Sequence, residues 1–482
     1  MNKSEFKADF LRNFHNLPTT DQSTALDKMT DFIFDTTPNS VFLLRGFAGT
    51  GKTSMLAAMV RTMERSGILC VLLAPTGRAA KVFSHYAEHP AYTIHKMIYR
   101  QRTLDFNPSF SLGFNAMKNV LFIVDEASMI SDVPNEMQMR ESLLESLLRF
   151  VYGNDRGCRL ILLGDTAQLP PVGEADSPAL RRSVLERYGM TVSAASLTTV
   201  VRQDEQTGIL WNATRVRTII EREFFGELPK IRFTSFADVK NIPGDQLIET
   251  LSDCYHNYGL EETMVVCRSN KRANIYNNGI RSQILWRESE LETGDLVMVA
   301  KNNYFWAEAA HKDDPAPSSE DDDGRLEFVA NGDIAEVQRV RNIRELFGFR
   351  FADCTLFFPD YEEELDATVL LDTLQAEAPA LTPQQSEQLF NNVMEDYMDI
   401  PLKQERLKKM RRDPFYNALQ LKYAYAVTCH KAQGGQWTNI FIDQGYIPED
   451  TSVKEYCRWL YTAMTRATSR LYLVNWRESQ SE

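Results

Sequence analysis

Long apolar runs are missing from this 482-residue sequence. None reaches the roughly 18 residues that a membrane-spanning helix needs, and the opening MNKSEFKADFLRNF lacks the apolar core of a signal peptide. The seven cysteines contain no C-x-x-C pair, which argues against a structural zinc site and against a disulfide framework. We therefore expect a cytoplasmic protein with no membrane-bound part.

Net positive charge is missing as well. The chain carries 53 Lys and Arg against 66 Asp and Glu, and this net charge of −13 disfavours non-specific coating of nucleic acid. A local nucleic-acid groove remains compatible with this total, because attraction to phosphate depends on the local field. The acidic stretch HKDDPAPSSEDDDG at 311–324 predicts an exposed loop. The basic stretch LKQERLKKMRRD at 402–413 is either a solvated helix face or a contact with DNA or a partner.

Length and composition indicate several ordinary globular domains. At 482 residues the chain suggests about three domains of roughly 150 residues each. Its 43% hydrophobic and 25% charged residues are typical of a soluble globular protein. No internal repeat of fixed period is visible in the sequence.

A glycine-rich loop is the first motif with a clear chemistry. The apolar run VFLLR at 41–45 predicts a buried strand, and SMLAAMVRTMERSG predicts the helix that follows. Between them, GFAGTGKTS fits the phosphate-binding pattern G-x-x-x-x-G-K-[ST] at Gly46, Gly51, Lys52 and Thr53. The glycines let backbone N–H groups point at phosphate oxygens, Lys52 would reach the β- and γ-phosphates, and Thr53 would ligate Mg²⁺. The alternative is a simple glycine-rich turn.

Two further apolar strands end in polar residues. VLFIV at 120–124 runs into Asp125, which suits Mg²⁺, and Glu126, which suits activation of the attacking water. RLILLG at 159–164 runs into GDTAQLPPVG, where Gln168 would bond the γ-phosphate and respond to its loss. The three strands together predict a site that binds a nucleoside triphosphate with Mg²⁺ and hydrolyses it.

In this order, GFAGTGKTS, VDEASMI and GDTAQLPPVG resemble motifs I, II and III of the superfamily 1 helicases. APTGRAAKVFS (74–84) and YTIHKM (92–97) resemble motifs Ia and Ib of that family. Its later motifs are matched by LTTVVRQ (197–203), AYAVTCHKAQGGQW (424–437) and YTAMTRATSRLYLV (461–474). The form of the motifs is closest to the RecD-like branch, which includes the phage Dda helicase and the Pif helicases. The resemblance covers nearly the whole chain, from Gln22 to about Val474.

This resemblance implies a nucleotide site built by two folds. Arg202 and Arg466 would join Lys52, Asp125, Glu126 and Gln168 as the catalytic set, because arginines neutralise charge developing on the γ-phosphate. The nucleotide-binding set comprises Gln22, Gly46, Phe47, Ala48, Gly49, Thr50, Gly51, Lys52, Thr53, Ser54 and Gln436. Gln22 would read the adenine edge. Gln436 stands where relatives often carry an acid, which leaves a ribose or coupling role open.

The resemblance also implies single-stranded DNA gripped by its backbone across both folds. The expected DNA-binding residues are Pro75, Thr76, Gly77, Thr93, His95, Phe106, Phe110, Thr428, His430 and Gln433. For the lone Thr and His residues, a purely structural role is the alternative. Phe106 and Phe110 flank an Asn-Pro turn in a predicted β-hairpin, where they either stack on bases like the pin of the RecD-like branch or fold into a local core.

The expected architecture is α/β, with two RecA-like P-loop folds. The first would span 1–200 and carry the pin-like hairpin at 98–117. The second would be discontinuous, at 201–290 and 420–482. Between its parts, at 291–419, the stretches GDLVMVAKNNYFW and FVANGDIAEVQRV fit a small SH3-like β-barrel, followed by a helical arm.

The resulting hypothesis is a monomeric ATP-dependent helicase that translocates on single-stranded DNA and unwinds tailed duplexes. The 5′-to-3′ direction follows from the resemblance alone, and replication or recombination proteins are candidate partners. One alternative is a non-motor, ATP-dependent DNA-binding switch. Another is the motor subunit of a nuclease complex, although no carboxylate–lysine cluster with nuclease spacing stands out in this sequence.

Overall fold

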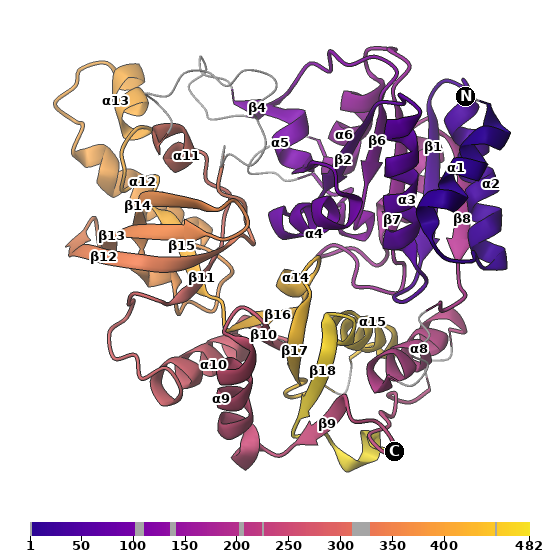
Figure 1. The fold of residues 1–482 in the computed structure, drawn as a ribbon. Coiled ribbons are helices and arrows are strands. Elements are labelled where there is room, and N and C mark those ends of the chain that lie inside the picture. Colours follow the sequence, from indigo (N-terminus) through magenta and orange to yellow (C-terminus); the bar gives the residue numbers. More distant parts are fainter. Residues whose placement is uncertain are drawn as a thin grey trace.

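The computed structural model describes residues 2–101, 110–134, 141–201, 207–223, 226–310, 328–448 and 451–482. Three groups of strands organise these residues (Figure 1): a six-stranded sheet at the upper right, a five-stranded sheet below it, and a closed five-stranded barrel at the left. No helix within the described ranges is both long and apolar enough to cross a membrane.

The first sheet is parallel throughout and runs in the order β3-β2-β6-β7-β1-β8. Its strands are β1 (Ser40–Gly46), β2 (Cys70–Ala74), β3 (Ala91–Thr93), β6 (Leu121–Val124), β7 (Arg159–Gly164) and β8 (Thr191–Leu197). The central strands are continuous apolar runs because helices cover both faces of the sheet. All carboxyl ends of a parallel sheet lie at one edge, so the polar residues after β1, β6 and β7 meet there.

Helices flank this sheet on both sides. Three of them, α1 (Lys3–Phe14), α2 (Thr20–Phe34) and α3 (Lys52–Arg65), share one hydrophobic core, whereas α6 (Leu143–Tyr152) and α7 (Arg182–Arg187) belong to the core of the opposite face. Capping boxes begin α1 and α2. The remaining helices of this part are α4 (Gly77–Ala87) and α5 (Ile94–Ile98).

A short hairpin interrupts the first fold after α5. Strands β4 (Tyr99–Gln101) and β5 (Phe110–Leu112) pair antiparallel, with Gln101 opposite Phe110. The tip at 102–109, including Phe106, lies outside the described residues, as does the side chain of Phe110. The expectation that these rings form a pin therefore stays a prediction.

The second sheet is also parallel, in the order β16-β10-β17-β18-β9. Its strands are β9 (Val239–Ile242), β10 (Thr263–Cys267), β16 (Ala426–Thr428), β17 (Trp437–Asp443) and β18 (Ala467–Val474). Its helices are α8 (Gly208–Glu221), α9 (Leu247–Tyr258), α10 (Asn270–Gln283), α14 (Cys429–Ala432) and α15 (Val453–Met464). The chain leaves this sheet after α10 and returns at β16, so the fold is discontinuous in sequence.

The inserted barrel closes on itself through five strands. They are β11 (Leu296–Val299), β12 (Ile334–Leu346), β13 (Phe349–Phe358), β14 (Glu363–Leu370) and β15 (Leu419–Tyr423). A buried ion pair fastens the barrel to the second fold, since Arg281 of α10 donates to Asp295 at 2.8 Å and both side chains are inaccessible to water. Strand β15 extends past residue 419, where the insertion was expected to end.

Outside the barrel strands, the described residues of the insertion include three α-helices. Helix α11 (Phe305–Ala310) precedes β12, and α12 (Pro383–Glu395) and α13 (Lys403–Met410) form an arm between β14 and β15. Leu389 and Met410 of the arm pack against Phe351 of the barrel. The short 3₁₀ helices of the chain are η1 (Ala127–Met129), η2 (Pro178–Leu180), η3 (Gly244–Gln246), η4 (Leu371–Thr373) and η5 (Glu478–Gln480).

Candidate ATP and DNA sites

The phosphate loop has the backbone that its glycines predict. Gly49 and Gly51 both have φ near +77°, a conformation that a side chain would strain. A Cβ atom on Gly46 would lie 2.7 Å from Cγ of Lys52, so this glycine is needed for space. Lys52 opens α3, and its ammonium donates to the carbonyls of Gly46 at 2.5 Å and Phe47 at 2.9 Å. Thr53 and Ser54 follow in the first turn of the same helix.

Gln22 lies directly against this loop. Its side chain is buried, its Nε2 donates to the carbonyl of Thr50 at 3.0 Å, and its Oε1 accepts from the N–H of Thr19 at 3.0 Å. Both ends of the amide are therefore engaged in holding α2 to the loop. This arrangement places Gln22 against the phosphate loop through contacts with the protein, and a contact between Gln22 and adenine stays a prediction.

The acidic pair stands at the end of β6, beside Lys52. Asp125 accepts from the N–H of Glu126 at 2.8 Å, and Glu126 itself has the left-handed φ of +50°, a strained backbone of the kind found at functional sites. Burial raises the pKa of Asp125 to about 6, and the charge of Glu126 adds to this while Lys52 opposes it. Negative charge is thus in excess here, which favours binding of a cation.

The donor set fits Mg²⁺ better than a fully protein-bound metal. No group of three or more His, Cys, Asp or Glu side chains within the described ranges is arranged to hold a metal ion. The candidate ligands, the hydroxyl of Thr53 and the carboxylate of Asp125, are hard oxygen donors. Mg²⁺ is commonly held by one or two such groups, with water and substrate phosphates completing its octahedron.

The residues after β7 connect the two folds through Tyr461 of α15. The hydroxyl of Tyr461 donates to Asp165 Oδ2 at 2.6 Å and accepts from the N–H of Ala48, in the phosphate loop, at 2.9 Å. Burial and the Asp165 carboxylate raise the pKa of Tyr461 well above its ordinary value, so the phenol keeps its proton. One phenol thereby links the phosphate loop, the segment after β7 and the second fold.

Neighbouring residues extend this connection. The N–H of Leu169 donates to Thr462 Oγ1 at 2.8 Å, and Gln433 Nε2 donates to the carbonyl of Leu169 at 2.8 Å. Between these contacts, Oε1 of Gln168 is buried without a hydrogen-bond partner among the described residues. An acceptor left in this state is a candidate for bonding a donor that arrives with the nucleotide or its water.

Of the two arginines expected to act on the γ-phosphate, the structure describes Arg466 but not Arg202. Arg466 is buried and donates to Thr462 and Gly435 carbonyls and to Thr465 Oγ1, all within the second fold. Arg202 lies outside the described residues, although the N–H of its neighbour Val201 donates to the carbonyl of Gly49 at 2.9 Å.

Three of the residues expected to bind DNA, Pro75, Thr76 and Gly77, lie at the start of α4. Thr76 caps this helix by accepting from the N–H of Ala79 at 3.2 Å. Arg78 reaches the second fold, where it donates to the carbonyl of Gln436 at 3.1 Å and lies 4.2 Å from the ring centre of Trp437. Gln436 was expected at the nucleotide, yet its described contacts are on this side of the molecule.

The barrel meets α4 at the same place. A Cβ atom on Gly77 would lie 2.6 Å from Asp333 Oδ1 and 2.7 Å from the hydroxyl of Tyr361. Burial raises the pKa of Asp333 to about 7, and the charge of Asp360 adds to this. Lys81 donates to the carbonyl of Pro359 at 2.6 Å. The first fold, the second fold and the barrel therefore converge over Pro75, Thr76 and Gly77.

Several predicted DNA contacts have structural roles in the described chain. Thr93 is buried and caps α5 by accepting from the N–H of Lys96 at 3.1 Å. Burial lowers the pKa of His95 to about 4, so this ring is neutral and offers no charge to a phosphate. Thr428 precedes α14 without a side-chain cap bond, and His430 is exposed on that helix. Gln433, in contrast, is turned toward Leu169.

Three residues without an expected role, Tyr461, Thr462 and Arg217, also contact the nucleotide site. Arg217 of α8 lies 4.4 Å from the ring centre of Phe47 in the phosphate loop, and thus contacts the nucleotide site from the second fold. Tyr461 and Thr462 stand within YTAMTRATSRLYLV, so a signal existed there. Only the arginine of that stretch was singled out, because the resemblance attached a catalytic role to it alone.

Comparison with known proteins gives two family matches in the order expected from the motifs. Residues 19–218 match a family model described as an AAA domain, and residues 423–474 match the UvrD-like helicase C-terminal domain. The first match covers the sheet with the phosphate loop. The second covers β16 to β18 with α14 and α15, which carry the inter-fold contacts.

Relatives include the ATP-dependent RecD2 DNA helicase of Deinococcus radiodurans, 31% identical over 39% of this chain and 22% of that protein. DNA helicase B of Mus musculus is 21% identical over 90% of this chain and 42% of that protein. The chain thus spans less than half the length of these two relatives. A Pif1 helicase from Bacteroides, solved with ADP-AlF3 and ssDNA, aligns with 96% of this chain and 93% of that chain, at 17% identity and a TM-score of 0.47.

Two parallel sheets, with a phosphate loop and an acidic pair at the carboxyl edge of the first, define a two-fold P-loop architecture. Over residues 19–218 and 423–474 the chain is similar to helicases, and the RecD2 DNA helicase is among its relatives.

Proposed function

We propose that this chain is an ATP-driven DNA helicase that moves along single-stranded DNA and separates duplexes. The observation that carries the proposal is the hydroxyl of Tyr461, which bonds Ala48 of the phosphate loop and Asp165 after β7 from the second fold. A change at the phosphates is thereby transmitted to the relative position of two folds. That coupling is what a motor requires and what an isolated phosphate-binding loop lacks.

In the proposed reaction, Lys52 and the loop N–H groups bind the β- and γ-phosphates, and Thr53 with Asp125 would hold Mg²⁺. Bound Mg²⁺ would neutralise phosphate charge during transfer. Glu126 orients the attacking water and accepts its proton, and Gln168 bonds the γ-phosphate. Arg466, and Arg202 with it, would then be drawn toward the phosphate as the two folds close.

Single-stranded DNA is proposed to lie over Pro75, Thr76 and Gly77, with Thr428 and His430 contributing from the second fold. The start of α4 supports this, because a helix of 11 residues directs its free N–H groups and positive end toward a phosphate. Phe106 and Phe110 are proposed to separate the strands at the fork by stacking on bases. Residues 1–200, 201–290 with 420–482, and 291–419 are proposed as the three moving parts.

The test is unwinding of duplexes that carry a single 5′ tail or a single 3′ tail. We expect unwinding only with ATP and Mg²⁺, and preferentially from the 5′ tail. Hydrolysis should be slow alone and should rise strongly with single-stranded DNA. Lys52→Ala is the matched control, since it should abolish both activities while the fold persists. Hydrolysis that is fast and indifferent to DNA would argue for a non-motor switch.

A further inference from the structure

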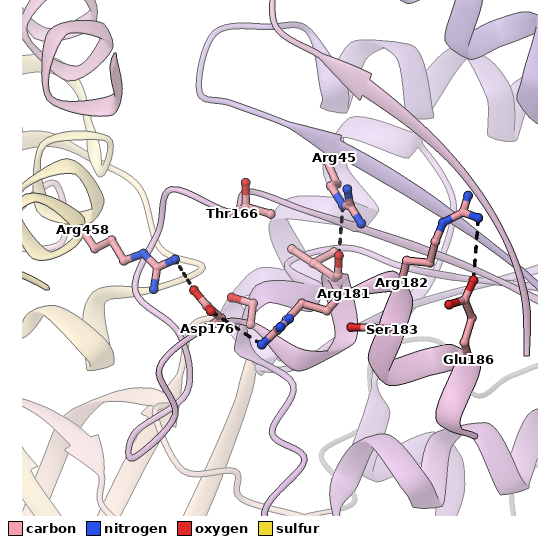
Figure 2. Close-up of a pocket in the computed structure, with 10 residues that line it drawn as sticks. Arg45, Thr166, Asp176, Arg181, Arg182, Ser183, Glu186 and Arg458 are labelled. Carbon is pink, nitrogen blue, oxygen red and sulfur yellow. Dashed lines mark hydrogen bonds and ion pairs between the residues drawn. The ribbon is translucent and has the colours of Figure 1, made fainter. Parts of the chain in front are cut away.

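A polar cavity lies between the two folds, on the side of the first sheet that α7 covers (Figure 2). Its volume is about 500 Å³, and four arginines line it: Arg45, Arg181, Arg182 and Arg458. We call it the arginine cavity. Arg45 comes from the end of β1, Arg182 from α7, and Arg458 from α15 of the second fold. None of these side chains has a place in the reaction described above.

The acids in the cavity do not neutralise these arginines evenly. Asp176 pairs with Arg458 at 2.7 Å and with Arg181 at 3.7 Å, whereas Glu186 pairs with Arg182 at 3.7 Å. That leaves Arg45. Its Nε donates to the carbonyl of Leu180 at 3.0 Å, and among the described residues no carboxylate forms an ion pair with it.

Arg45 also experiences a like charge. Burial and the positive charge of Arg182 both lower the pKa of Arg45, which means that the two guanidinium groups repel each other across the cavity. Guanidinium stays protonated under these conditions, so an anion bound beside Arg45 would offset the repulsion. Four arginines facing two acids leave this cavity with two positive charges in excess.

The lining also limits what the anion looks like. A volume of about 500 Å³ falls in the range of small-ligand sites. Leu180 is the one apolar residue among the described lining residues, and no aromatic ring is among them. Hydroxyls of Thr166 and Ser183 stand beside the guanidinium groups instead. Such a lining offers no aromatic ring for a base to stack on, and it matches the forked donors that bind a compact phosphate oxyanion.

We propose that the arginine cavity binds inorganic phosphate, the product of the hydrolysis proposed above, on whose function this inference rests. Each wall of the cavity is continuous with a part of the ATP site. Arg45 immediately precedes Gly46, Thr166 immediately follows Asp165, and Arg458 lies one helical turn before Thr462. Phosphate held by Arg45 and Arg182 together with Arg458 stabilises the contact between the two folds, and its departure releases them.

The binding test uses the full chain and inorganic phosphate in a chloride buffer, measured by isothermal titration calorimetry. The background is Lys52→Ala, which disables the phosphate loop. In that background we expect phosphate binding to persist, and to weaken at least tenfold with Arg45→Gln or with the half-exposed Arg182→Gln. Arg187→Gln is the matched control on the same helix, because Arg187 faces Asp132 outside the cavity. It should change the Kd less than twofold.

Two outcomes overturn the proposal. Loss of all phosphate binding in Lys52→Ala would assign the ion to the phosphate loop, and equal affinities for the Arg45, Arg182 and Arg187 variants would remove the cavity. A short single-stranded oligonucleotide that displaces phosphate in an Arg45-dependent manner would assign the site to DNA phosphodiesters instead. A chain that binds phosphate through Arg45 but hydrolyses no ATP would refute the proposed function while leaving the anion site intact.

Discussion

The first fold meets its neighbours at two junctions that differ in chemistry. At the nucleotide-side junction, Tyr461 and Thr462 contact Ala48, Asp165 and Leu169 through buried hydrogen bonds between 2.6 and 2.9 Å. At the strand-side junction, Arg78 and Lys81 of α4 donate solvent-exposed hydrogen bonds to the carbonyls of Gln436 and Pro359, and the buried Asp333 of the barrel lies against Gly77.

Because of this difference, the nucleotide-side junction depends on precise alignment, whereas the exposed contacts of the strand-side junction can be replaced. Buried hydrogen bonds tolerate little misalignment, because a lost partner leaves a polar atom without water. Exposed hydrogen bonds from charged side chains to carbonyl oxygens contribute little, and a phosphate oxygen can replace the carbonyl as acceptor. Under the proposed function, the nucleotide-side junction responds to small changes at the phosphates, whereas the strand-side junction opens to the DNA backbone. The following predictions, ordered by expected effect, test this contrast.

The largest effect is expected at the acidic pair. Glu126→Gln keeps the shape of the side chain but removes the proton acceptor for the attacking water. We expect DNA-stimulated hydrolysis to fall ~10²-fold or more while ATP still binds, because a general base contributes about this much. Steady-state kinetics and a fluorescent ATP analogue measure the two effects. Glu64→Gln, on the half-exposed surface of α3, is the control and should hydrolyse ATP normally.

Breaking the nucleotide-side junction comes next. Tyr461→Phe keeps the buried ring but removes the hydroxyl that joins Ala48 to Asp165. We expect kcat to fall roughly thirtyfold, since two hydrogen bonds of about 1 kcal/mol each are lost and a tenfold rate change is about 1.4 kcal/mol. The affinity for single-stranded DNA should stay within twofold. Tyr258→Phe, at an exposed site, provides the comparison. A loss confined to DNA binding would contradict the assignment of Tyr461 to the nucleotide.

Breaking the strand-side junction should have a smaller effect, and it should change the affinity for DNA rather than the rate of hydrolysis. Arg78→Ala removes the contact with the Trp437 ring and the bond to Gln436. We expect the Kd for single-stranded DNA to rise about threefold, as suits a partly exposed cation–π contact of about 0.5–1 kcal/mol. Hydrolysis without DNA should not change. Fluorescence anisotropy with a labelled oligonucleotide measures the effect, and Arg65→Ala, exposed at the end of α3, is the control.

The smallest effect concerns pH. The pKa of Asp333 is about 7 in the folded chain against an ordinary value of 3.8, so the folded state holds the proton more tightly. Its contribution to stability is therefore complete below about pH 4 and is lost as the pH rises through about 7. Asp333→Asn should flatten the fall in Tm between about pH 4 and 7. An unchanged slope in this variant would remove Asp333 as the titrating group.

Much of the fold was predictable because its signals are local. The strands before Gly46, Asp125 and Asp165 are uninterrupted apolar runs, and they became parallel strands whose ends share one edge. The barrel was anticipated from two alternating stretches with Gly-Asp turns, and the structure closes it. Its last strand, β15, was not anticipated, because Leu419–Tyr423 reads equally as part of the following fold.

The motifs predicted where the site residues lie in the fold better than they predicted which atoms the side chains of these residues contact. Gln22 was expected to meet adenine, but its amide bonds Thr19 and Thr50. Gln433 was expected to meet DNA, but it bonds Leu169. Motif position specifies which residue approaches a junction, whereas the partner depends on side-chain direction and on the packing of a second element. The sequence carries neither of these directly.

The sequence by itself determined the chemistry that depends on neighbours in the chain. A glycine-rich loop between an apolar run and a helix binds phosphate wherever it occurs, because backbone N–H groups and the helix end supply the donors. Only the tertiary structure decided what that chemistry is coupled to. Ala48 and Tyr461 are 413 positions apart, and Arg45 and Arg458 line one cavity although they belong to different folds. Such pairs arise when two separate cores pack together, and no local pattern records that packing.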